Sequence, residues 1–136
     1  MDLTKTLQIS ASAMRAQGMR LRVVAENIAN ANSTGETPND PPYRRQVVTF
    51  RNAFDREVGA DTVRIGSVRP DPSEFVRRYE PGHPSADESG YVQYPNVNTL
   101  IEMMDMREAQ RSYEANLSII ETSRTMLVRT IELLRA

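Results

Sequence analysis

Hydrophobic side chains recur at coiled-coil spacing through the last third of the chain. Residues 98–136 contain neither proline nor glycine, so nothing in this stretch interrupts a helix. Such a helix would run roughly 55 Å at about 1.5 Å per residue, and one small domain does not cover a seam of that length. The pattern predicts that it packs along other helices. Two rows of one heptad register form the predicted seam: Met103, Gln110, Leu117, Arg124 and Ile131, and Met106, Tyr113, Ile120, Leu127 and Leu134.

Polar residues on this seam favour an assembly over a single-domain core. Gln110 and Arg124 occupy heptad positions, where polar side chains set register and partner choice at some cost in stability. The alternative is a core helix of a small bundle, in which the neighbouring methionines are ordinary core filler. Short side chains between the rows would let a second helix approach closely on a flanking face: Ala109, Asn116, Ser123 and Thr130.

A second heptad pattern predicts a helix over residues 3–31. Gly18 weakens its interior by about 1 kcal/mol relative to alanine. We expect the helix to end within residues 30–35, where asparagine and glycine can adopt the left-handed conformation that closes a helix. The residues expected to face the other helix are Leu7, Met14, Leu21, Val24 and Ile28.

The middle of the chain has a different character, because all eight prolines fall between residues 38 and 95. Residues 36–42 predict an exposed loop, and Asn98 or Thr99 is expected to cap the final helix, with Thr99 and Glu102 spaced for a capping box. Short strands are predicted over 43–50, 61–68, 75–79 and 91–94.

The predicted fold class is therefore mainly α. Two long terminal helices pair as an antiparallel coiled coil, and a small, irregular, β-rich insertion lies between them. The predicted segments are 1–35 for the first helix, 36–97 for the proline-rich loop and insertion, and 98–136 for the second helix.

Composition narrows the possible functions. The chain has 17 basic and 18 acidic residues, so no excess of positive charge indicates binding to nucleic acid or to an anionic membrane. The absence of cysteine excludes disulfides and thiolate metal sites. The first residues do not match a cleavable secretory signal, and no window approaches eighteen apolar residues. We expect neither cleavable secretion nor membrane insertion.

The sequence offers no catalytic constellation. Its one histidine, His83, lies between Pro81-Gly82 and Pro84, and this setting predicts a turn residue hydrogen-bonded to a neighbouring backbone group. Neither a Walker motif nor a dinucleotide fingerprint can be assembled from six scattered glycines. A hydrolase using His83 lacks a second imidazole. We therefore predict a protein that is not an enzyme, with no catalytic residues, no cofactor and no metal.

Several motifs resemble those of bacterial flagellar basal-body rod proteins. The run Glu-Asn-Ile-Ala-Asn-Ala-Asn-Ser-Thr-Gly over 26–35 is similar to the signature that closes the first helix in flagellar axial proteins. Further matches lie at 42–45, 79–84 and 90–98, and they narrow the resemblance to the proximal rod. The motif residues are Asn27, Ala29, Asn30, Asn32, Thr34, Gly35, Tyr43, Arg44, Arg45, Pro81, Gly82, His83, Pro84, Pro95, Asn96, Val97 and Asn98.

The resemblance implies a structural subunit that polymerises through its terminal helices into a drive shaft across the periplasm. It also implies delivery by the flagellar type III export apparatus and a location in the basal-body rod. The implied partners are other copies of the chain, rod proteins of the FlgB, FlgF, FlgG and FliE types, and the export apparatus. No nucleic acid or small-molecule substrate is implied. The alternative is a soluble helical-hairpin adaptor or chaperone that binds an amphipathic client helix.

Overall fold

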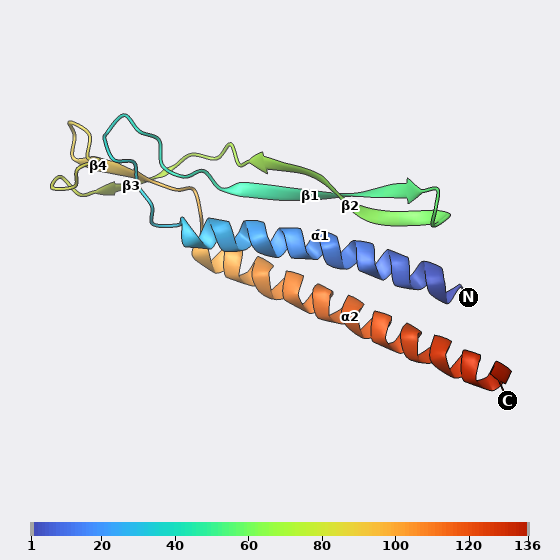
Figure 1. Ribbon diagram of the computed structural model, residues 1–136. Helices are drawn as coiled ribbons and strands as arrows, with labels where there is room; N and C mark the ends of the chain where they lie inside the picture. Colours follow the sequence, from blue (N-terminus) through green and yellow to red (C-terminus); the bar gives the residue numbers. More distant parts are fainter. Residues whose placement is uncertain (1, 136) are drawn as a thin grey trace. The chain divides into compact units, whose positions relative to one another are not determined.

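The computed structural model describes residues 2–135. In this part of the chain a β region of two small sheets lies between two long helices in sequence order, so the content is mixed rather than mainly α (Figure 1). The elements are α1 (Leu3–Ala29), β1 (Gln46–Asp55), β2 (Ala60–Pro70), β3 (Val76–Tyr79), β4 (Tyr91–Tyr94) and α2 (Thr99–Arg135).

Both ends of α1 are held by side chains. Asp2 Oδ1 accepts the backbone N–H groups of Thr4 and Lys5, at 3.0 and 3.2 Å, which satisfies donors that the first turn leaves free. The expected left-handed ending is wrong, because the only positive φ angles within residues 2–135 are at Gly59 and Gly90. Instead, Asn30 Nδ2 donates back to the Glu26 carbonyl at 2.9 Å, and tight turns follow.

The start of α2 is capped by Asn98, whose Oδ1 accepts the N–H of Leu100 at 3.1 Å. The expected capping box is wrong. Glu102 does not return to the backbone of Thr99, because its carboxylate binds Asn27 and Arg45.

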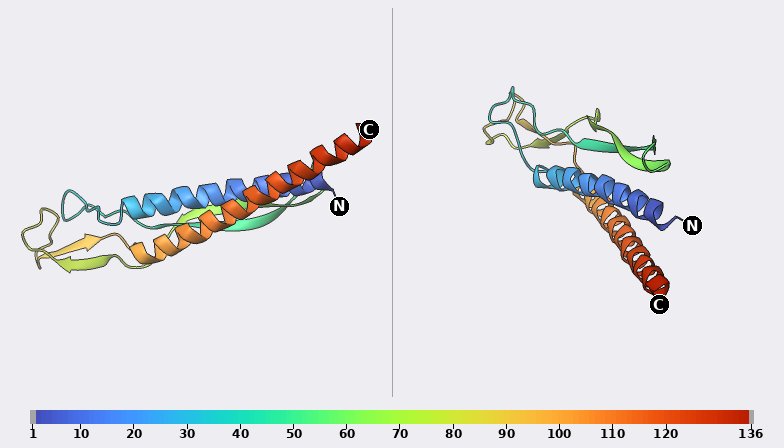
Figure 2. Two further views of the ribbon diagram at one scale, coloured as in Figure 1. Left: turned by 90° about the horizontal axis from the view of Figure 1, so that it is seen from below. Right: turned by 45° about the vertical axis from the view of Figure 1, so that its right-hand side comes forward.

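Strands β1 and β2 form a hairpin and lie side by side in each view (Figure 2). They occur where strands were predicted, but β1 begins later and continues further toward the turn, and β2 is longer than predicted at both ends. Asp55 holds that turn, because its Oδ1 accepts the N–H of Glu57 at 3.0 Å. Gly59 closes it with φ of 67°, a conformation that favours glycine.

Strands β3 and β4 are antiparallel, with Val76 opposite Tyr94 and Tyr79 opposite Tyr91. Strand β4 matches its predicted range. Val92 and Tyr94 turn one face of this sheet into the core, where Val92 is fully buried. The proline-rich middle therefore forms two separate pairs of strands rather than one larger sheet.

The chain forms two compact units, and each draws on both helices. One unit comprises residues 22–48 and 68–106, and its buried apolar side chains are Val23, Val24, Ala31, Val92 and Tyr94. The other comprises residues 2–21, 49–67 and 107–135, where the buried side chains are short: Ser10, Ala16, Thr62, Ala109 and Ser123. The core of each unit is thin.

The loop after α1 requires glycine at position 35. A Cβ atom there would lie 2.4 Å from the Asp40 carbonyl oxygen, which is backbone and cannot swing away. We predict that Gly35→Ala lowers the free energy of unfolding by about 1–3 kcal/mol, measured by urea titration of ellipticity.

Gly18 provides the matched control, because a Cβ there meets nothing within 4 Å. Gly18→Ala should raise the free energy of unfolding by about 1 kcal/mol. Equal stability of Gly35→Ala and the unaltered chain would show that the loop is not held as described.

Candidate assembly site: a buried polar clasp and an exposed helix surface

The largest fully buried side chain in the described residues is a carboxylate, that of Glu102 in the first turn of α2. Burial of an unpaired carboxylate costs several kcal/mol. Here Oε1 accepts a hydrogen bond from Arg45 Nε, and Oε2 accepts one from Asn27 Nδ2 at 3.2 Å. The helix N-terminus also favours negative charge. Glu102 is therefore stable only while α1 and the segment before β1 remain in place.

Asn27 joins the end of α1 to that segment. Its Oδ1 accepts the Tyr43 hydroxyl at 2.8 Å and the Gln46 N–H at 2.9 Å. Its Nδ2 donates to the Gln46 carbonyl at 2.9 Å as well as to Glu102. The amide thus pairs with both backbone groups of Gln46 as a strand would, and all its hydrogen-bonding capacity is used.

Arg45 extends the network to two further carboxylates. Its Nη1 donates to Asp71 Oδ2 at 3.1 Å, and its Nη2 lies 3.8 Å from Asp105 Oδ2. Its backbone also bonds, with the N–H donating to Asn96 Oδ1 at 2.8 Å and the carbonyl accepting the Asp71 N–H. We call the group Asn27, Tyr43, Arg45, Asp71, Asn96 and Glu102 the clasp.

Arg44 holds the loop that carries Asp71. Its Nη1 donates to the carbonyls of Asp71 and Ser73 at 2.7 and 2.8 Å, and its guanidinium stacks 4.2 Å from the Phe75 ring centre. Asn96 Nδ2 donates to the same two carbonyls. Arg44 and Asn96 thus both bind the backbone of the short loop at residues 71–73.

The charge states of the clasp suit these bonds. Burial raises the pKa of the Tyr43 hydroxyl, and Glu26 and Glu102 add to that rise, so Tyr43 stays a donor. The N–H and hydroxyl of Ser73, with Arg45, lower the pKa of Asp71. For Arg45, burial works to lower the pKa, but hydrogen bonds to Glu102 and Asp71 outweigh it, so the pKa is raised. The ion pairs therefore persist at neutral pH.

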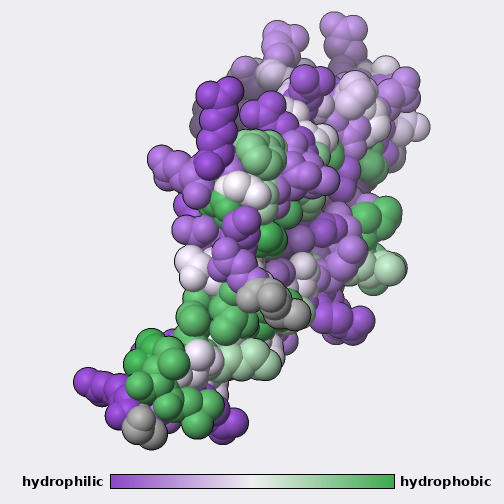
Figure 3. Space-filling view, turned by 90° about the vertical axis from the view of Figure 1, so that its right-hand side faces the viewer, coloured by the Kyte–Doolittle hydropathy of each residue, from purple (hydrophilic) through white to green (hydrophobic). Residues whose placement is uncertain are grey.

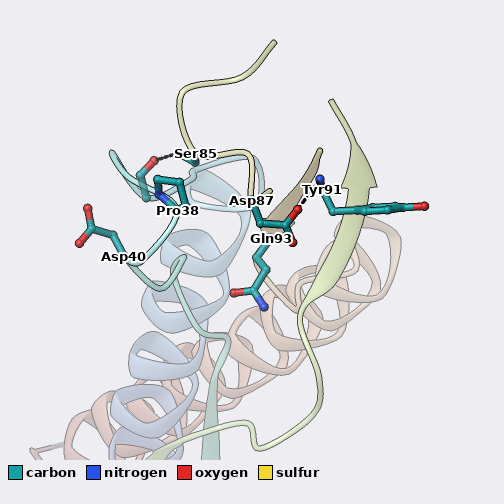
Figure 4. Close-up of a pocket in the computed structure, with 7 residues that line it drawn as sticks. Pro38, Asp40, Ser85, Asp87, Tyr91 and Gln93 are labelled. Carbon is teal, nitrogen blue, oxygen red and sulfur yellow. Dashed lines mark hydrogen bonds between the residues drawn. The ribbon is translucent and has the colours of Figure 1, made fainter. Parts of the chain in front are cut away.

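The turn that carries motif residues 81–84 is joined through Ser85 to the loop after α1, and we call this contact the latch. His83 Nδ1 accepts the Ser85 N–H at 3.1 Å, which confirms the predicted turn role, and Ser85 Oγ donates to the Gly35 carbonyl. A pocket of about 110 Å³ lies beside this latch (Figure 4). Both of its carboxylates already accept hydrogen bonds, Asp40 from Thr37 and Asp87 from Tyr91. The pocket belongs to the loop packing.

The structure brings together only part of the sequence motif. Asn27, Tyr43, Arg44, Arg45 and Asn96 converge, whereas the remaining members close α1, form turns or precede α2. Pro95 is fully buried, Val97 is half-buried and Asn98 is the cap. Ala29, Asn30, Asn32, Thr34 and Gly35 lie where α1 ends, and Pro81, Gly82, His83 and Pro84 lie in the turn after β3.

Asp71, Asp105 and the role of Glu102 were missed by sequence reasoning. Asp71 lies between two prolines in an unremarkable loop, and Asp105 looks like a solvated helix residue. Glu102 carried a signal, since it lies three positions after Thr99, but that spacing indicated a cap. Only the fold brings these carboxylates to Arg45.

The predicted packing residues differ in burial. On α1, Val24 is buried, and Leu7, Met14, Leu21 and Ile28 are half-buried. On α2, the most deeply buried positions are Glu102, Ala109 and Ser123, which share one heptad row that flanks the predicted row of Met106 and Ile120. Met106, Ile120 and Leu127 beside this row are half-buried.

The other predicted row of α2 is exposed in the single chain. Leu117 is 40% exposed, and Met103 and Ile131 are about half exposed. Figure 3 shows apolar side chains gathered at the lower end of the view, where α2 ends. Exposed positions of the predicted seam are Met103, Gln110, Tyr113, Leu117, Arg124, Ile131 and Leu134.

Within residues 2–135 no group of histidine and acidic side chains is arranged to hold a metal ion. Neither described helix has a stretch that is both long and apolar enough to cross a membrane. The site described above consists of structural contacts within the chain and of exposed helix surface.

Two family models match the chain. Residues 7–35 match the flagella basal body rod protein family, and residues 88–133 match the flagellar basal body rod FlgEFG protein C-terminal family. The chain is 49% identical to the flagellar basal-body rod protein FlgC of Agrobacterium fabrum, covering 98% of this chain and 96% of the relative. It is 40% identical to FlgC of Salmonella typhimurium, covering 98% of each, and 35% identical to FlgC of Borreliella burgdorferi, covering 99% of each.

Fold, contacts and relatives together define a structural, non-enzymatic component of the bacterial flagellum, located in the basal-body rod. The chain belongs to the FlgC family of flagellar basal-body rod proteins. Its relatives favour the rod hypothesis over a soluble adaptor.

The clasp predicts that replacing the side-chain amide at position 27 by a carboxylate lowers the stability strongly. Asn27→Asp removes the donor to the Gln46 carbonyl and places a second carboxylate beside buried Glu102. We expect the free energy of unfolding to fall by about 3 kcal/mol or more, measured by urea titration. Asn32→Asp makes the same chemical change at an exposed position and should leave the stability within about 0.5 kcal/mol. Similar stabilities for the two variants would contradict the clasp.

Proposed function

We propose that this rod protein is a subunit of the proximal rod, and that it polymerises through its terminal helices into the drive shaft that transmits torque across the periplasm. The observation that carries the proposal is the exposed apolar row of α2. A chain with so thin a core gains little by leaving Met103, Leu117 and Ile131 in water, so their burial against neighbours is the simplest source of further stability.

We further propose that α1 and α2 pair as an antiparallel coiled coil. Contacts near the end of α1 support this pairing, since Asn27 binds Glu102 near the start of α2. Arg20 lies about two turns earlier on α1 and forms an ion pair with Glu108, at 3.5 Å. Leu3 and Thr6 line a groove with residues 118–126. These three contacts support the proposed antiparallel direction, because earlier residues of α1 are paired with later residues of α2.

This arrangement suits torque transmission. Paired helices resist bending better than irregular chain, and the clasp fixes the end of one helix against the start of the other through hydrogen bonds that leave no free donor on Asn27. The proposed partners are further copies of this chain, rod proteins of the FlgB, FlgF, FlgG and FliE types, and the flagellar export apparatus.

Leu117→Asp tests polymerisation through α2. Leu117 is 40% exposed in the single chain, so the substitution should change the stability of the free subunit little. In the rod it would bury an unpaired carboxylate, which costs more than the roughly 1.5–3 kcal/mol that a buried leucine contributes. We expect loss of swimming and of rod incorporation, measured in soft agar and by fractionation of basal bodies.

Thr125→Asp is the control, because it adds the same charge at an exposed position on the side of α2 away from the buried row. It should swim normally. Normal swimming by Leu117→Asp would show that the exposed row is not buried in the working rod.

We also propose that residues 2–9 carry information for delivery by the flagellar type III export apparatus. They lie at the start of α1, where Leu3 and Thr6 line an open groove rather than a packed core. Deletion of residues 2–9 should leave the protein in the cytoplasm of cells with intact export, measured by fractionation. Efficient appearance outside the inner membrane without rod assembly would assign these residues to packing alone.

A further inference from the structure

Helix α2 carries two exposed flanks, one on each side of its buried row. The glutamate flank comprises Leu117 and Val128 with Glu114 and Glu132 at its rim. The arginine flank comprises Ala115 and Met126 with Arg111 and Arg129 at its rim. All eight residues are exposed in the single chain. At 3.6 residues per turn, residues two apart point to nearly opposite sides of a helix, so the flanks cannot meet within one chain.

The two flanks carry the same spacing. Each apolar residue of the glutamate flank has an apolar residue two positions earlier on the arginine flank, Ala115 before Leu117 and Met126 before Val128. Nearer the start of α2, the exposed residues Ile101 and Met103 repeat this relation. A copy of the helix laid parallel and displaced by two or three residues, about 3–4.5 Å, would place each apolar residue against an apolar partner.

The charged residues at the two rims are related by a similar displacement, of three positions. Glu114 and Glu132 are five turns apart, about 27 Å, and Arg111 and Arg129 have the same separation three positions earlier. Within residues 2–135 none of these four side chains takes part in an ion pair. Both carboxylates of one copy would thus face both guanidinium groups of the next.

We propose that α2 of one copy packs parallel beside α2 of a second copy, with the glutamate flank of the first against the arginine flank of the second. This rests on the proposed polymerisation through α2 and names the partner of that surface. The occupant is a second copy because one sequence carries both complementary flanks in one register. Such a contact joins different surfaces of identical chains, and because each copy is displaced along the helix axis from the last, it repeats without closing into a ring and builds an open helical assembly.

Charge reversal separates this contact from pairing within one helix. One variant, Glu114→Arg with Glu132→Arg, makes both rims basic; the other, Arg111→Glu with Arg129→Glu, makes both acidic. Like charges across an interface cost several kcal/mol, so each variant expressed alone should enter basal bodies roughly tenfold less or worse. Expressed together in one cell, the two variants should be restored to near normal incorporation, because each supplies the charges that the other lacks.

Each outcome decides the proposal. Arg111 and Glu114 are also helix neighbours three positions apart, but mixing chains cannot repair a contact within one helix. Failure of the mixture to restore incorporation, with both free variants as helical by far-ultraviolet ellipticity as the unaltered chain, would overturn the contact between copies and favour a different rod protein on these flanks. Normal incorporation of either variant alone would also overturn it.

A cysteine ladder provides an independent test, since the chain has no cysteine of its own. Leu117→Cys with Ala115→Cys in one chain places thiols on opposite sides of α2, where the side chains diverge and cannot bridge. Mild oxidation of basal bodies should yield a ladder of dimers, trimers and higher species of this chain. Leu117→Cys with Met126→Cys misaligns the register by several turns and should give none; a ladder from this pair instead would contradict the displacement.

These tests separate the contact between copies from the proposed polymerisation through α2. Normal incorporation of Leu117→Asp would remove the proposed polymerisation through α2, whatever the charge variants do. Exclusion of Leu117→Asp from the rod, without rescue by the charge mixture and without a ladder, would leave polymerisation standing and remove only the copy-to-copy contact.

Discussion

The buried carboxylate of Glu102 is the constraint on which the folded subunit depends. A charge without water must be matched by donors, and the donors here come from the end of α1 and from the segment before β1. If either helix moved away, the Glu102 carboxylate and the Asn27 amide would lose the hydrogen bond that joins them. Buried polar networks of this kind favour one arrangement over its alternatives, because apolar contacts tolerate sliding whereas hydrogen bonds do not.

Because a polar network fixes the helix ends, the folded subunit buries little apolar surface. The clasp fixes where α1 ends and α2 begins. In the unit of residues 2–21, 49–67 and 107–135, the buried side chains are short, among them Ala16, Ala109 and Ser123. Larger side chains of α2 such as Met103, Leu117 and Ile131 are exposed, and the proposed function assigns them to contacts with neighbouring subunits. A rod subunit that buried them internally would be more stable alone and would have less to offer an assembly.

Periodicity predicted both helices, and strand-forming residues between turns predicted all four strands of residues 2–135, because both signals act through local geometry. It did not identify which side of α2 is buried within the chain. Heptad counting selects large apolar residues such as Leu117, whereas the single chain buries the neighbouring row that includes Ala109. The clasp could be predicted only in part. Asn27 and Arg45 stood out in a motif, but the meeting of Arg45 with Asp71 depends on a fold that brings together residues from separate loops.

A density map of the intact basal body, at a resolution that shows side chains, would show directly whether the clasp and the flanks of α2 behave as proposed. We expect Asn27 and Arg45 still to hold the Glu102 carboxylate in the assembled rod, and Leu117 and Met126 to be covered by neighbouring chains on opposite sides of α2. A map in which α1 has separated from the start of α2, or in which both flanks of α2 face solvent, would contradict this expectation.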